Sequence, residues 1–293
     1  MHDYLLSVLL GIVEGLTEFL PVSSTAHLRI SEALLGIDLS NGYWKMYSIV
    51  IQLGAILCLP IYFRSRIANF FSTFPRGERG NRTFIDHPIT LVLIAFIFTA
   101  GPAFLLTKVI GKHLESLYIM GASLLLGGIV MWIVDAFYGR TPPGGRYKTE
   151  HMEEMSIFQS VWIGICQIAS AVFPGTSRSM STIAAGQISG MSRAAALEFS
   201  FFVSIPTMIA ATAYDLLRIL HPKNPAMGAA LGSMPANTHQ WIVLSIGFVV
   251  SFVVALGVVA WFMNWVRHRG FTPFAIYRII VGLAVLVWAS RGI

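Results

Sequence analysis

Long apolar runs recur along the whole chain and predict helices that cross a membrane. A spanning helix needs about 20 apolar residues, and six runs are long enough. They lie near residues 44–63, 89–107, 117–135, 198–217, 241–265 and 273–290. Barrel strands would instead alternate apolar and polar residues over about ten positions, and these runs do not alternate. The pattern therefore predicts an all-α integral membrane protein with six transmembrane helices.

Two further apolar stretches are interrupted by charge and by helix breakers. Glu14 and Glu18 lie in the first, which ends at Pro21, and Pro174-Gly175 ends the second. The stretches and the short helix-like segments that follow them are 5–20 with 24–36, and 158–173 with 177–190. A Ser/Thr-rich loop joins the members of each pair. Because irregular backbone at membrane depth is tolerated where it lines a protein cavity, we predict two re-entrant helical hairpins.

The two predicted hairpins match when the chain is shifted against itself by 153 residues. The shift aligns Ser7-Val8 with Ser160-Val161, Gly11-Ile12 with Gly164-Ile165, Pro21 with Pro174, and Ser24 with Ser177. Each half then holds one hairpin and three spans, and an odd number of spans inverts the second copy relative to the first. We therefore predict a single membrane domain over residues 1–293, an inverted-topology repeat of 1–137 and 157–293 joined by a cytoplasmic linker, 138–156.

Basic residues gather between the apolar runs and predict the orientation of the chain. Ten lie in loops on one side, namely Arg64, Arg66, Arg76, Arg79, Arg82, Arg140, Arg146, Lys148, Arg267 and Arg269. The five on the other side are Lys108, Lys112, Arg218, Lys223 and Arg291. The positive-inside rule places the first group in the cytoplasm, so the net charge of +6 reflects topology rather than a nucleic-acid partner.

Composition excludes several classes of protein. A charged fraction of only 12% and a mean hydropathy of +0.70 are incompatible with a soluble or a disordered chain. Cys58 and Cys166 both lie in apolar stretches, so neither a disulfide framework nor a zinc site is predicted. The first residues lack a basic segment, which predicts no cleaved signal peptide.

Glu14 and Glu18 are four residues apart and share one helix face within an apolar stretch. Two carboxylates on one face repel each other, which raises the pKa of one or requires a cation or an arginine between them. We therefore treat both as candidate catalytic residues and candidate metal ligands. The alternative is a pair of helix-terminal glutamates among lipid headgroups.

His27 follows Ser24 by three residues and Ser23 by four, so its imidazole and one hydroxyl share a side of the predicted helix. A histidine beside a serine is the minimum for activating a nucleophile, and a histidine can also activate water. The alternative is an interfacial histidine that is hydrogen-bonded to the backbone.

Arg178 lies in the loop of the second predicted hairpin, PGTSRSMST at residues 174–182. An arginine at the centre of a membrane costs about 2.5–3.5 kcal/mol on the insertion scale, so it requires a partner. Hydroxyl groups and the expected start of a helix surround it, and an arginine at a helix N-terminus is suited to binding phosphate. The alternative is a salt bridge from Arg178 to Glu14 or Glu18 that joins the two halves.

Glu198 and Arg278 are candidates for residues that support the site without contacting the substrate. Glu198 opens a predicted span, where an interfacial position is also expected. Arg278 follows Pro273 by five residues and either snorkels to the surface or supplies a second cation near the site.

At these residues the chain resembles the undecaprenyl pyrophosphate phosphatase family of bacterial membranes, the bacitracin-resistance type. The motifs that carry the resemblance are EGLTEFLPVSST at 14–25, PGTSRS at 174–179, IQLGAI at 51–56 and PFAIYR at 273–278. The similarity extends over nearly the whole chain.

The resemblance implies an integral-membrane phosphatase that hydrolyses a C55 prenyl diphosphate to the monophosphate and phosphate, recycling the carrier lipid of peptidoglycan synthesis. It implies a multi-pass protein of the bacterial inner membrane, with its active site open to the outer face. It also implies a divalent cation (Mg²⁺ or Ca²⁺) and no organic cofactor. The expected partners are the prenyl diphosphate and membrane lipid. A homodimer, in which the partner is a second copy of the chain, is a further possibility.

Residue by residue, the resemblance assigns Glu14 and Glu18 to the acidic pair and His27 to the catalytic histidine. Ser23, Ser24 and Thr25 match the hydroxyl loop, and Gly175, Thr176, Ser177, Arg178, Ser179 and Thr182 fall in the phosphate-binding loop. The family usually has glycine where this chain has Ala26 and Met180. If either position needs a positive φ, its side chain costs energy, and Met180 could also narrow the pocket.

The main alternative function is a transporter or flippase of a phosphorylated lipid or an anion, because carriers use inverted repeats with broken helices. A carrier needs Arg178 but no serine–histidine pair, so Ser24 and His27 favour hydrolysis. A non-catalytic scaffold leaves the polar groups at membrane depth unexplained. Residue types alone leave open whether Ser24 forms a phosphoenzyme or water attacks directly.

Overall fold

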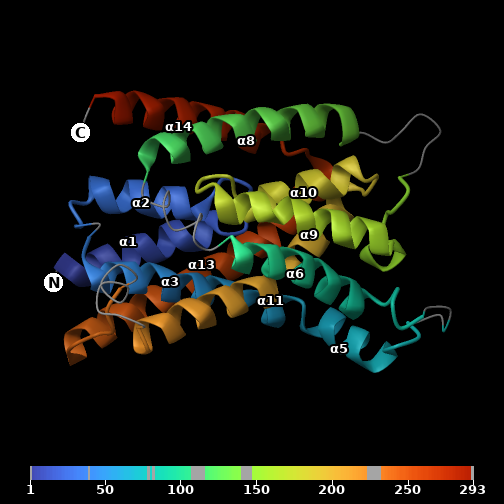
Figure 1. Cartoon of the computed structure of the whole chain (residues 1–293), viewed down its shortest axis with the longest axis horizontal. Helices are drawn as coiled ribbons and strands as arrows, with labels where there is room; N and C mark the ends of the chain where they lie inside the picture. The colour runs from blue at the N-terminus through green and yellow to red at the C-terminus, as the bar shows by residue number, and fades with distance from the viewer. Residues whose placement is uncertain are drawn as a thin grey trace. The chain divides into compact units, whose positions relative to one another are not determined.

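Helices make up the regular structure of the residues that the structure describes (Figure 1). The computed structural model describes residues 2–38, 40–77, 80, 83–106, 116–139, 147–222 and 232–291. Its helices are α1 His2–Thr17, α2 Ser24–Leu34, α3 Gly42–Ile56, α4 Cys58–Tyr62, α5 Arg64–Thr73, α6 Pro88–Leu105, α8 Leu117–Tyr138, the 3₁₀ helix η1 Met152–Glu154, α9 Ile157–Val172, α10 Arg178–Ile188, α11 Arg193–Leu220, α13 Thr238–His268 and α14 Thr272–Ser290.

Among the described residues, six helical segments are long and apolar enough to cross a membrane, and they confirm the six predicted spans. They are Gly42–Tyr62, Pro88–Leu105, Leu117–Tyr138, Arg193–Leu220, Thr238–His268 and Thr272–Ser290. The side chains of Asn41, His87 and Ser116 cap three of them by accepting hydrogen bonds from backbone N–H groups of the first turn. Capping residues are polar, so hydropathy alone places helix ends a few residues away from where they lie.

The described chain forms two compact units. Unit 1 comprises Met1–Phe19, Ser24–Tyr62 and Ser204–Ala260, and unit 2 comprises Leu20–Ser23, Phe63–Val203 and Trp261–Ile293. Each unit therefore combines segments from both predicted repeats. In unit 2, α8 packs along α14, and α9 packs against α6 and α10. In unit 1, α1 packs against α2 and α3.

The two predicted hairpin segments fold into pairs of helices with matching lengths. Helices α1 and α9 each have 16 residues, and α2 and α10 each have 11. The residue before each second helix has a positive φ, 73° at Ser23 and 70° at Ser177. Such a conformation costs a residue with a side chain about 1–2 kcal/mol, so each turn is held by contacts around it.

A serine and a glycine of α1 pack closely on α13 within unit 1. The Ser7 hydroxyl donates a 2.6 Å hydrogen bond to the carbonyl oxygen of Val243. One turn later, a Cβ on Gly11 would come within 2.9 Å of the carbonyl oxygen of Gly247. The small residues let the two backbones approach, as at helix contacts in membranes.

The same pair of residue types packs α9 on α6 within unit 2. The Ser160 hydroxyl donates a 2.5 Å hydrogen bond to the carbonyl oxygen of Leu91. A Cβ on Gly164 would lie 2.5 Å from the carbonyl oxygen of Ala95. The residues aligned by the 153-residue shift therefore make equivalent contacts in the two units.

Helix α5 lies where the sequence indicated only a basic loop over 64–88. Its apolar residues follow a helical spacing, and Phe70 is buried against Phe202, with 5.4 Å between the ring centroids. Arg66, on the same helix, donates hydrogen bonds to Glu153 of η1 and, at 2.9 Å, to Glu198 of α11. A basic segment that was predicted as a loop is thus held to the linker and to a span.

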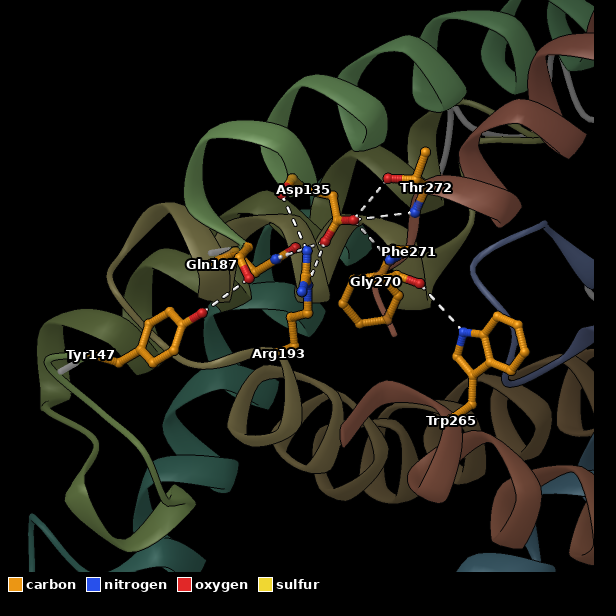
Figure 2. A network of polar contacts seen from close by, with 9 residues as sticks. Asp135, Tyr147, Gln187, Arg193, Trp265, Gly270, Phe271 and Thr272 are labelled. Carbon is orange, nitrogen blue, oxygen red and sulfur yellow. Dashed lines mark hydrogen bonds and ion pairs between the residues drawn. The ribbon is translucent and has the colours of Figure 1, made fainter. Parts of the chain in front are cut away.

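Asp135 joins the ends of four helices in unit 2 (Figure 2). It is only 2% exposed, and its Oδ1 accepts hydrogen bonds from Arg193 Nε at 2.7 Å and Gln187 Nε2 at 3.4 Å. Its Oδ2 accepts from the N–H of Phe271 at 2.9 Å and from the N–H and hydroxyl of Thr272 at 3.2 and 3.0 Å. The carboxylate therefore pairs with an arginine and caps the first turn of α14.

Asp135→Ala is expected to destabilise the protein by about 3 kcal/mol, because Arg193 and the start of α14 lose a buried charged partner. The measurement is the melting temperature of the purified protein in detergent. Asp38→Ala removes an exposed aspartate whose hydrogen bonds stay within its own turn, and it serves as the control. Equal melting temperatures for the two variants would contradict the prediction.

The ion pair of Arg66 with Glu153 predicts that the stability of the fold decreases at acid pH. Burial raises the pKa of Glu153, but the hydrogen bond and charge of Arg66 outweigh it, so the pKa lies below its usual value of 4.5. A lowered folded-state pKa stabilises the fold above 4.5, and that contribution is lost as the pH falls through the folded-state value.

Wild-type protein is therefore expected to melt at a higher temperature than Arg66→Gln at neutral pH, and this difference should shrink as the pH falls below 4.5. Arg267→Gln removes the same charge from an exposed position and should show no such difference. A constant gap between wild type and Arg66→Gln across this range would count against the ion pair.

Candidate active site

The first group of candidate residues begins at the end of α1. The N–H of Glu18 donates a 2.9 Å hydrogen bond to the carbonyl oxygen of Glu14, so the helical turn continues past Thr17. Both carboxyl groups therefore share one face, as predicted from their spacing. Glu14 is fully buried and Glu18 is 7% exposed, in an environment where a carboxylate depends strongly on charged or hydrogen-bonding partners.

Ser24 is the first residue of α2 and contacts Glu18 directly. Its hydroxyl donates a 2.5 Å hydrogen bond to Glu18 Oε2, and the residue is 8% exposed. A hydroxyl has a single proton, so this contact directs the proton of Ser24 to a carboxylate. Glu18 is thus within hydrogen-bonding distance of a serine hydroxyl, which is the geometry that a base and a nucleophile require.

His27 lies one turn further along α2, as its spacing from Ser24 predicted. It is half-buried, whereas Thr25 is exposed and Ala26 is fully buried. The hydroxyl proton of Ser24 is directed to Glu18.

The second group of candidate residues surrounds the start of α10. Gly175 has a φ of 93°, and a Cβ there would lie 2.7 Å from the carbonyl oxygen of Met120. Glycine is required on both counts. The chain then turns at Ser177, and the half-buried Arg178 is the first residue of the helix. Arg178 therefore lies at the end of α10 where the helix dipole favours an anion.

Hydroxyl groups in this loop hold its shape. Ser177 Oγ accepts from the N–H of Met180 at 3.3 Å and lies 3.0 Å from Ser179 Oγ. The Ser179 hydroxyl donates a 3.0 Å hydrogen bond to the carbonyl oxygen of Leu20. Thr182 is fully buried, with its hydroxyl 2.7 Å from that of Ser200. Among the predicted phosphate ligands, the hydroxyl groups of Ser179 and Thr182 thus form hydrogen bonds within the protein. Thr176 and Arg178 are half-buried.

Unit 2 brings the two hairpin loops together. Besides the bond from Ser179 to Leu20, the guanidinium of Arg278 donates to carbonyl oxygens of both loops, at Pro21 and at Gly175 and Thr176. Arg278 is fully buried, which excludes the alternative that it snorkels to a surface. It lies beside the loops, as one of the two predictions for it required.

Neither departure from the family's glycine pattern falls on a residue with positive φ. Ala26 and Met180 are both helical, and the positive φ values lie at Ser23 and Ser177 instead. Met180 is 4% exposed, and its terminal methyl would lie 2.9 Å from a Cβ built on Gly127. Its side chain is therefore accommodated against α8.

Glu198 belongs to a different cluster. Its carboxylate accepts from Arg66, and Arg66 also binds Glu153, so its contacts join α11 to α5 and not to the hairpin loops. The sequence analysis left two alternatives for Glu198, a position at the membrane interface and a supporting position near the site.

Two buried carboxylates were missed at the level of sequence. Glu32 of α2 is fully buried. Its carboxylate accepts hydrogen bonds from Ser48 Oγ at 2.6 Å and Arg29 Nη1 at 3.0 Å. Asp135 lies at the end of a predicted span. An acidic residue within or next to an apolar run was the available signal for both.

The carboxylates could contribute to binding a divalent cation. Among the described residues, no group of three or more His, Cys, Asp or Glu side chains is placed to hold a metal ion. Glu14 and Glu18 supply the hard oxygen donors that Mg²⁺ and Ca²⁺ prefer, and phosphate oxygens commonly complete such a shell. The donor set therefore fits a cation that arrives with a phosphorylated substrate.

Comparison with known proteins gives a full-length match. The family model described as bacitracin resistance protein BacA matches residues 7–284. A protein of Koribacter versatilis (strain Ellin345) named undecaprenyl-diphosphatase is 68% identical over 291 residues, which cover 99% of this chain and 100% of that protein. Proteins of the same name from Caldanaerobacter subterraneus subsp. tengcongensis and Rhizobium johnstonii are each 38% identical, over 97% and 99% of this chain and 96% and 99% of their own lengths. With its two hairpin motifs and this full-length similarity, the chain belongs to the bacitracin resistance protein BacA family.

Proposed function

We propose that this protein is a membrane phosphatase that hydrolyses undecaprenyl diphosphate to undecaprenyl phosphate and phosphate. The proposal places it in the bacterial inner membrane with its site open to the outer face, where it recycles the lipid carrier of the cell wall. The names of its relatives support the substrate. The hydrogen bond from Ser24 to Glu18 carries the chemistry, because a transporter has no need of a serine held against a buried base.

In the proposed first step, Ser24 attacks the terminal phosphorus of the diphosphate. A bond forms between Ser24 Oγ and phosphorus, Glu18 takes the hydroxyl proton, and the bond to the bridging oxygen breaks. The leaving group is undecaprenyl phosphate, a stable anion that needs no proton to leave. In the second step water attacks the phosphorus, the bond between phosphorus and Ser24 Oγ breaks, and Glu18 returns its proton to Ser24. We assign the acceptance of the water proton to His27, which is half-buried one turn away on α2 and releases that proton to solvent with the phosphate.

Arg178 and the first N–H groups of α10 are the proposed ligands of the phosphate oxygens. A guanidinium at a helix N-terminus binds the ground-state charge and stabilises the charge that develops on transfer. The prenyl chain needs no polar partner and stays in the lipid. When a divalent cation is bound by Glu14 and Glu18, it supplies further positive charge to the diphosphate.

The same proposal includes two re-entrant hairpins related by an inverted repeat. It is supported by the equal lengths of α1 and α9 and of α2 and α10, and by the positive φ at Ser23 and Ser177. The equivalent contacts of Ser7 with α13 and Ser160 with α6 support it independently. A homodimer stays a prediction of the sequence.

Glu18→Gln is expected to lower kcat about 10²- to 10⁴-fold, because the amide cannot accept the proton of Ser24. The measurement is phosphate release from undecaprenyl diphosphate in detergent micelles. Asp38→Asn makes the same chemical change at an exposed site and should retain the wild-type rate. A wild-type rate in Glu18→Gln would remove Glu18 from the mechanism.

A substrate labelled with ³²P in its terminal phosphate distinguishes the covalent route from direct attack by water. Acid quenching during turnover should leave label on the wild-type protein and none on Ser24→Ala, because the proposed phosphoenzyme forms on this serine. Phosphate release without protein-bound label in His27→Ala, whose hydrolysis step should be slow, would show that water attacks directly.

A further inference from the structure

Arg278 is a buried arginine that has no role in the proposed chemical steps. It lies in the apolar helix α14, is 0% exposed, and donates four hydrogen bonds to backbone carbonyl oxygens. Nη1 binds Pro21 at 3.0 Å, and Nη2 binds Gly175 and Thr176 at 3.0 Å and Ser123 at 3.1 Å. A buried guanidinium thus has carbonyl groups as its partners.

Three of these carbonyl groups belong to the two backbone breaks. Pro21 lies between α1 and Ser23, and Gly175 and Thr176 lie between α9 and Ser177. Carbonyl groups in a loop past the end of a helix have no intrahelical partner, and a buried carbonyl group needs a hydrogen-bond donor, which the guanidinium supplies. A single side chain therefore fixes the loop that precedes Ser24 and the loop that precedes Arg178.

The neighbouring helix is shaped around this side chain. A Cβ on Gly127 of α8 would lie 2.2 Å from Arg278 Nη2, and a Cβ on Gly128 would lie 3.1 Å from Arg278 Cβ. A side chain at position 127 would displace the guanidinium from its carbonyl partners. The α8–α14 contact thus depends on glycine where the arginine passes.

We propose that Arg278 is a positioning residue of the phosphatase site. It holds the carbonyl ends of both hairpin loops, so that Ser23 and Ser177 keep their left-handed backbone and the residues after them face the substrate. It does not bind the diphosphate itself. The inference rests on the proposed phosphatase function for its kinetic consequence, and on the contacts of Arg278 alone for its structural consequence.

Two variants disturb the contact from opposite sides. Arg278→Lys keeps the charge but lacks the planar fork that reaches several carbonyl groups, and Gly127→Ala keeps the arginine but pushes it away. Gly257→Ala is the matched control, since a Cβ there meets nothing within 4 Å. Arg178→Lys serves as the comparison for loss of a phosphate ligand.

The first measurement is hydrogen exchange of the backbone amides in segments 20–26 and 174–180, which needs no substrate. Both variants are expected to raise exchange in both segments and to leave α6 and α9 as in wild type. Exchange that changes in neither loop, or rises equally throughout the protein, overturns the proposal. This result stands even if wild-type protein proves inactive on undecaprenyl diphosphate, which would refute only the proposed function.

The second measurement is the hydrolysis of undecaprenyl diphosphate. Misplacing reacting groups by about 1 Å costs about 10²-fold, so both variants should lower kcat by about that factor with KM little changed. Arg178→Lys should raise KM as well. The double variant should be no slower than the slower single variant, because both changes break the same contact. A raised KM for Arg278→Lys with normal loop exchange would make Arg278 a phosphate ligand and overturn the proposal.

Discussion

Breaking a helix in an apolar protein leaves backbone groups without partners, and the described structure depends on how these groups are satisfied. Each unpaired N–H or C=O costs several kcal/mol away from water, roughly 2–7 kcal/mol depending on the reference state. At the two breaks the carbonyl groups point to Arg278 and the hydroxyl of Ser179. The loops that follow α1 and α9 can therefore keep an irregular backbone in a buried position.

The two sides of each break have opposite electrostatic character. Carbonyl ends need a cation, whereas the N–H groups at the start of the next helix attract an anion. Arg278 satisfies these loop carbonyl groups from within the protein, and the start of α10, where Arg178 lies, has the polarity that favours an anion. Asp135 contributes from a distance, because it caps the first turn of the same helix that carries Arg278 and so fixes where that helix begins. The same backbone geometry thus places one arginine against loop carbonyl groups and another at a helix N-terminus.

Local patterns in the sequence predicted much of the fold and the identity of the candidate residues. Apolar length located the six spans, and breakers located α2 and α10, because both signals involve residues that are neighbours in the chain. The partners of Arg278 and Asp135 could not be predicted in this way, because they are distant in the sequence. Pro21 is 257 residues from Arg278, and Thr272 is 137 residues from Asp135. Helix α5 was missed for a different reason. Its arginines indicated a loop, and its helical spacing of apolar residues is short and becomes significant only because Phe70 packs against Phe202.

The partner of Ser24 was beyond the sequence because it depends on an unusual backbone conformation. Helical spacing pairs Ser24 with His27, and nothing in the residue types indicates that Ser23 adopts a φ of 73° and that Glu18 then meets the hydroxyl. Glycine would take this conformation with less strain, yet both breaks use serine. At Ser177 the hydroxyl caps α10 by accepting from the N–H of Met180, a contact worth about 1 kcal/mol that glycine would lose in part. Relative to glycine the cap gains only about a few tenths of a kcal/mol, so it offsets a small part of the backbone strain of about 1–2 kcal/mol. The packing and hydrogen bonds around each turn must therefore hold its serine in place, whereas Ala26 and Met180 stand, without strain, inside the helices that follow.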